Sequence, residues 1–93
     1  MKQVPATEAT LKSILGMSSE EASAVSSAIV KARRSNDEND VTAALELALE
    51  FMDGFGVEFG DDAEESYVDT TADRTLYARQ TAEKCEFYIG ELK

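Results

Sequence analysis

The spacing of hydrophobic residues changes along the chain, from a helical period in the first half to an alternating period in the second. Up to residue 53, apolar residues recur every three or four positions, which is typical of helices that bury one face. This spacing predicts a helix over residues 7–15 that stops at Gly16, a second that ends near Ser35, and a third over residues 41–53. The wide apolar face of the third helix predicts that it is the central packing element.

Residues that commonly begin and end helices stand at these predicted boundaries. Thr7 and Asp40 are placed to cap the first and third helices with their side-chain oxygens. Ser18 and Glu21 have the spacing of a capping box, in which each side chain accepts a hydrogen bond from the backbone N–H of the other residue. Gly54 is the residue type that commonly follows a helix end, so it is predicted to stop the third helix.

The second half predicts short strands. Residues 56–60 alternate between glycines, residues 67–69 and 74–78 give weaker signals, and residues 85–89 alternate most clearly. The stretch 72–84 also contains many helix formers, so a C-terminal helix is the alternative there. Strands are the preferred interpretation.

Alternation in the final strand separates its two faces, with Cys85, Phe87 and Ile89 inward and Glu86 and Tyr88 outward. The chain is therefore predicted to be a single α+β domain over residues 1–93, with two to three N-terminal helices packed on a small antiparallel β-sheet. The predicted core contains seven residues: Leu45, Leu49, Met52, Val57, Leu76, Phe87 and Ile89.

Charge is concentrated in the middle of the chain. The 93 residues include 19 acidic and 9 basic ones, for a net charge of −10. Residues 1–36 are near-neutral to slightly basic and 66–93 nearly neutral, whereas residues 37–65, predicted as helix, loop and strand, contain eleven carboxylates and no lysine or arginine. Ten of them are the candidate partner-binding residues: Asp37, Glu38, Asp40, Glu46, Glu50, Asp53, Asp61, Asp62, Glu64 and Glu65.

Three interpretations of this acidic segment remain open. The first is a solvated face that confers solubility. The second is a surface that binds a basic partner by imitating the phosphate spacing of DNA. The third interpretation is a calcium site, because residues 37–40 and the predicted loop 61–65 supply enough oxygens. Neither stretch has the ligand spacing of a twelve-residue calcium loop. No metal and no cofactor are therefore predicted.

Composition also argues against several kinds of chemistry. The chain has no histidine, which removes the usual general base and the common nucleophile pairs, and no catalytic residue is predicted. The negative charge opposes nucleic acid or anionic membrane as a direct ligand, and Lys31, Arg33 and Arg34 are explained by the negative end of a helix dipole. The single cysteine, Cys85, is predicted to be a buried, unreactive thiol in a cytoplasmic protein.

Four aromatic residues are predicted to point outward from the sheet: Phe55, Tyr67, Tyr77 and Tyr88. Outward aromatics are enriched at protein interfaces. Partial burial against a neighbouring helix or a second subunit is the alternative.

The second half of the chain resembles small accessory proteins of bacteriophages and prophages. The likeness rests on an apolar helix end at residues 48–54 that runs into 56–58, and on the later segments 67–69, 75–77 and 87–90. The chain departs from that pattern at its end, where those proteins often have an acidic tail with a tryptophan. The resemblance implies a phage origin and a helical start followed by a small antiparallel sheet. It assigns no functional residue.

Charge and resemblance together predict a non-enzymatic, phage-type protein in the cytoplasm of the host bacterium. It would bind a basic, nucleic-acid-handling surface of a host protein, such as a CRISPR effector, and inhibit or adapt it. A structural or self-assembling phage protein that forms a homodimer is the alternative. A small enzyme is the least favoured class.

Overall fold

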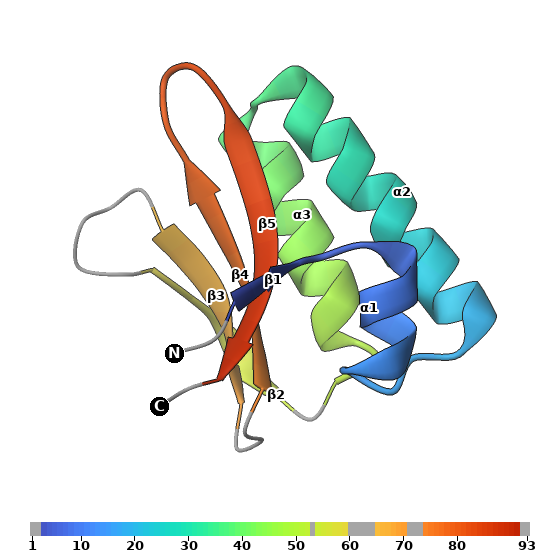
Figure 1. Ribbon diagram of the computed structural model, residues 1–93. Helices are drawn as coiled ribbons and strands as arrows, with labels where there is room; N and C mark the ends of the chain where they lie inside the picture. Colours follow the sequence, from blue (N-terminus) through green and yellow to red (C-terminus); the bar gives the residue numbers. More distant parts are fainter. Residues whose placement is uncertain (1–2, 53, 60–64, 71–73, 92–93) are drawn as a thin grey trace.

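Three helices lie against one face of a five-stranded antiparallel sheet in the computed structural model, which describes residues 3–52, 54–59, 65–70 and 74–91 (Figure 1). This two-layer arrangement confirms the predicted α+β class. In chain order the elements are β1 (Gln3–Pro5), α1 (Glu8–Ser13), α2 (Ser19–Ser35), α3 (Glu38–Leu49), β2 (Gly54–Phe59), β3 (Glu65–Thr70), β4 (Arg74–Gln80) and β5 (Cys85–Glu91).

The strands β2 to β5 form a meander, and β1 adds a fifth strand beside β5, which gives the order β1-β5-β4-β3-β2. Every neighbouring pair is antiparallel. Val4 lies opposite Ile89 and Pro5 opposite Tyr88, and the pairing continues past β1 where the Ala6 N–H donates to the Phe87 carbonyl at 3.1 Å. The sequence did not predict β1, because three residues that include a proline carry no alternating pattern.

The core lies between the helices and the sheet. Buried alanine, valine, leucine and isoleucine side chains of α2 and α3 pack on inward residues of β4 and β5. Four of the predicted core residues are buried as expected, namely Leu45, Leu76, Phe87 and Ile89. The other three, Leu49, Met52 and Val57, are only partly buried and pack against the edge of the core, so the prediction was too broad there.

The first two helices begin at the predicted caps. The backbone N–H of Thr10 donates to Oγ1 of Thr7 at 3.2 Å. Ser18 and Glu21 form the predicted capping box, with bonds of 3.1 Å to Oγ of Ser18 and 2.9 Å to Oε1 of Glu21. The helix α1 ends at Ser13, two residues before its predicted end, and Gly16 then adopts a φ of +73°, which favours glycine.

The predicted bounds of the third helix were wrong at both ends. Asp37, not Asp40, is the N-cap, because its carboxylate accepts the N–H of Asn39 at 2.8 Å. After Leu49 the backbone N–H groups of residues 50, 51 and 52 each donate to the carbonyl three residues earlier instead of four. The α-helix therefore ends four residues before its predicted end. Gly54 does not stop the helix but begins β2.

The predicted strands 67–69, 74–78 and 85–89 lie within β3, β4 and β5, each of which is longer than its sequence signal. Residues 56–59 of the first predicted strand lie in β2, while its last residue, 60, is outside the described part. The ambiguous stretch contains β4, so the strand interpretation is confirmed and the helical alternative is wrong. The β4–β5 turn is closed by the N–H of Thr81, which donates to the carbonyl of Lys84 at 2.8 Å. Glu65 begins β3 rather than ending a loop. Residues 60–64, on which the rest of that predicted loop falls, lie outside the described part.

Candidate functional site

The outer face of α2 and α3, away from the sheet, carries a shallow groove between the two helices. It consists of two adjoining hollows that share Lys31 and Asp40: an upper hollow of about 310 Å³, which reaches Arg34 and Ser35 at the end of α2, and a lower hollow of about 440 Å³, which reaches Glu50 at the end of α3. Because α2 and α3 are joined by only two residues, they run antiparallel and pack side by side. We call this feature the α2–α3 groove.

Two of the predicted partner-binding carboxylates contribute to the fold. Asp37 caps α3. Asp40 accepts a hydrogen bond from the Ser35 hydroxyl at 2.7 Å and lies 3.9 Å from the Lys31 ammonium. These contacts hold the end of α2 against the start of α3. Asp40 is therefore partly neutralised within the chain.

Three other predicted carboxylates are exposed and form no ion pair or side-chain hydrogen bond with any described residue, namely Glu38, Glu46 and Glu50. Glu46 and Glu50 are four residues apart and both border the lower hollow, whose remaining lining includes Ala28, Ala43 and Leu47. Glu38 lies in the first turn of α3, outside the groove. The groove therefore brings together Asp40, Glu46 and Glu50.

The remaining predicted carboxylates are not placed. Asp53, Asp61, Asp62 and Glu64 lie outside the described residues, and so does the side chain of Glu65. Since α3 ends at Leu49, the described part of the predicted helical stripe consists of Glu46 and of Glu50, the C-cap of α3.

Sequence reasoning missed the basic part of the groove. Lys31 and Arg34 line the upper hollow beside Val30, which is 47% exposed. The last turn of α2 contains Arg34, as the dipole argument predicted, but Lys31 lies across from Asp40. The available signal was the short link between the second and third predicted helices, residues 36–40, because so short a link makes two helices antiparallel and brings the end of one beside the start of the next.

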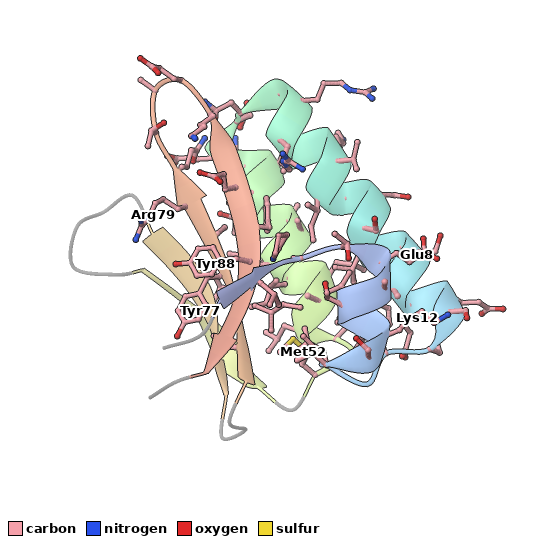
Figure 2. The ribbon with its side chains drawn as sticks, viewed as in Figure 1. Glu8, Lys12, Met52, Tyr77, Arg79 and Tyr88 are labelled. Atoms are coloured by element: carbon pink, nitrogen blue, oxygen red, sulfur yellow. The ribbon has the colours of Figure 1, made fainter. Side chains whose placement is uncertain are left out.

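Aromatic residues occupy the other face of the sheet. Tyr77 and Tyr88 stack with ring centroids 5.0 Å apart and an angle of 9° between the rings, and Figure 2 shows both on the side away from the helices, with Arg79 nearby. Tyr77 is only 7% exposed, so its predicted exposure was wrong, while Tyr88 is half-buried. The register places Tyr67 opposite Tyr77.

Cys85 is buried and unpaired, as predicted. Burial raises the pKa of its thiol because desolvation disfavours the thiolate; the Arg33 guanidinium opposes that shift and the Glu86 carboxylate adds to it. Lys84 does not activate the thiol, since its ammonium pairs with Glu86 at 3.3 Å. A neutral, buried thiol is a poor nucleophile.

Within the described residues, no three histidine, cysteine, aspartate or glutamate side chains gather as they would around a metal ion. None of the described helices is both long enough and apolar enough to cross a membrane. The groove offers carboxylates, two cations and an apolar floor, which are means of binding a protein surface. Comparison with known proteins found no matching family, no similar curated protein and no similar solved structure.

Proposed function

We propose that this protein is a non-enzymatic, phage-type protein that binds a basic, nucleic-acid-handling surface of a host protein and inhibits or adapts it. The observation that carries the proposal is the exposure of Glu38 and Glu46 on α3 and of Glu50 at its C-cap, without an ionic partner among the described residues. Phage origin and action in the host cytoplasm belong to the proposal and rest on the resemblance of the sequence.

The physical basis is electrostatic complementarity. A net charge of −10 on 93 residues attracts a basic surface and accelerates its approach. Glu46 and Glu50 lie about 6 Å apart along the helix axis, close to two phosphate steps of a DNA strand, about 7 Å. Because α3 is packed on the core through Val41 and Leu45, the backbone positions that carry its carboxylates are fixed before a partner arrives.

The test is capture of a bacterial host protein on the immobilised chain, compared between two variants of equal charge. Glu46→Lys with Glu50→Lys alters α3, whereas Glu20→Lys with Glu83→Lys makes the same change of charge elsewhere on the surface. We expect the wild type and the control to retain the same nucleic-acid-binding protein, the α3 variant to lose it, and high salt to release it.

The captured protein is then assayed for nucleic-acid binding with and without the chain. Loss of nucleic-acid binding is the expected result. Equal capture by both variants would show that the α3 carboxylates are only a solvated face, and unchanged nucleic-acid binding would exclude mimicry. Circular dichroism of each variant checks that its fold is intact.

A further inference from the structure

The two ends of the α2–α3 groove carry opposite charge. Lys31 and Arg34 border the upper hollow, while Glu46 and Glu50 border the lower one. The Lys31 side chain is 75% exposed, and its distance of 3.9 Å from Asp40 is at the limit of an ion pair, so its ammonium is accessible to another group. A surface with a positive and a negative end complements a copy of itself that is turned end for end.

The spacing along the helices suits such a pairing. Taking the level of the Lys31–Asp40 pair as the origin, Arg34 lies about 4.5 Å above it, and Glu46 and Glu50 lie about 9 and 15 Å below it, at 1.5 Å per residue. Ala28 and Ala43, each three residues from that pair, lie about 4.5 Å below it. A twofold axis perpendicular to the helices at the level of Ala28 and Ala43 moves Lys31 to the level of Glu46 and Arg34 nearly to that of Glu50.

Hydrophobic shape is complementary under the same rotation. Val30 is 47% exposed on α2, one of two large apolar side chains that are exposed among the described residues. The twofold axis keeps α2 over the partner's α2 and brings Val30 to the level of the lower hollow, between the levels of Ala43 and Leu47, where the small side chains of Ala28 and Ala43 leave room. A partly exposed valine and an apolar hollow would thus cover one another twice in a symmetric pair.

We propose that the chain forms a twofold-symmetric homodimer through the α2–α3 groove. In it, Lys31 and Arg34 of one copy pair with Glu46 and Glu50 of the other, and Val30 of each copy fills the lower hollow of its partner. Four helices then pack across the interface, and both sheets face outward. The net charge of −10 on each copy opposes association, and the alternating ends of the groove overcome this opposition locally.

This inference does not depend on the proposed host partner, but it limits how that partner binds. Glu46 and Glu50 are covered in the dimer, so a basic partner and a second copy exclude one another on this face. Reversal of the two cations separates the two uses, because Lys31→Glu with Arg34→Glu removes the dimer contacts and leaves the carboxylates in place.

The experiment is a charge swap followed by sedimentation velocity over a range of concentrations up to about 1 mM. We expect the wild type to become dimeric as its concentration rises. Lys31→Glu with Arg34→Glu, and separately Glu46→Lys with Glu50→Lys, should each weaken the dimer at least about tenfold. An equimolar mixture of these two variants should form a heterodimer, which also shows that both are folded.

Glu20→Lys with Glu83→Lys serves as the control and should leave the dimer intact or strengthen it by lowering the net charge. A wild type that stays monomeric throughout, a dimer that survives either groove reversal, or a mixture that fails to pair would each overturn the proposal. None of these results would bear on the capture of a host protein, which is measured on the immobilised chain.

Discussion

At the scale of single residues, Thr75 is the least expected side chain in the sheet. It is fully buried, yet its hydroxyl has no hydrogen-bond partner within the described residues. A buried hydroxyl without a partner costs about 1–3 kcal/mol. We therefore expect Thr75→Val, which keeps the shape, to raise the free energy of unfolding by about 1 kcal/mol in urea titrations. Thr81→Val is the control, because the Thr81 hydroxyl accepts the N–H groups of Glu83 and Lys84, and its loss should be destabilising.

Burial also governs the chemistry of Cys85, which is 3% exposed. We expect a thiol reagent to label it slowly in the native protein and quickly in urea. Because the folded state raises the pKa of this thiol, the folded state holds its proton more tightly than the unfolded chain does. That contribution to stability is complete at neutral pH and is lost as the pH rises from the ordinary thiol pKa through the raised one. The advantage of the wild type over Cys85→Ala should shrink accordingly, and fast labelling of the native protein would contradict burial.

At the scale of elements, Asn36 joins the helical layer to the β4–β5 turn. It ends α2 with a φ of 50°, its side-chain amide donates to the Thr81 carbonyl at 2.9 Å, and Nε2 of Gln80 donates to the Asn36 carbonyl at 2.7 Å. Asn36→Gly keeps the backbone conformation and should cost about 1 kcal/mol for the lost side-chain bonds. Asn36→Ala should cost about 1 kcal/mol more, because alanine resists a left-handed backbone.

Urea unfolding measures both variants, with Asn39→Ala as the control, since Asn39 is exposed on α3. If glycine and alanine proved equally stable at position 36, the backbone conformation would carry no cost there. If neither variant lost stability, the contact with the β4–β5 turn would be unimportant.

Elements were predictable where their signals are local. Thr7 and Ser18 cap their helices through bonds to residues three positions away, and a sequence displays that spacing directly. The third helix was misplaced because Asp37 and Asp40 are equally suitable caps by residue type, and only the contact of Asp40 with Ser35 in the folded chain distinguishes them. The carboxylates of the groove were predicted from the concentration of acidic residues in the sequence. The place of its two cations beside them was not, because it depends on the antiparallel packing of α2 on α3.

At the scale of the whole molecule, the two outer surfaces differ in character. The helical face combines charges of both signs with an apolar floor, whereas the far face of the sheet presents stacked tyrosines (Figure 2). The core between them keeps these surfaces apart, so that changes to the groove leave the tyrosine stack untouched. This separation makes surface variants of α2 and α3 interpretable, because the sheet remains an internal reference for folding.

The position of β1 has a consequence for how the molecule opens and closes. β5 lies between β1 and β4, so β1 pairs with one edge of β5 while the hairpin partner β4 pairs with the other. Val4 and Ile89 are 85 residues apart in sequence, so closing this contact costs about 2–3 kcal/mol more chain entropy than closing a tight hairpin. A strand of three residues makes few contacts that offset this cost. We therefore expect β1 to dock last in folding and to detach first in native-state hydrogen exchange, which would expose the backbone edge of β5 while the rest of the sheet stays paired.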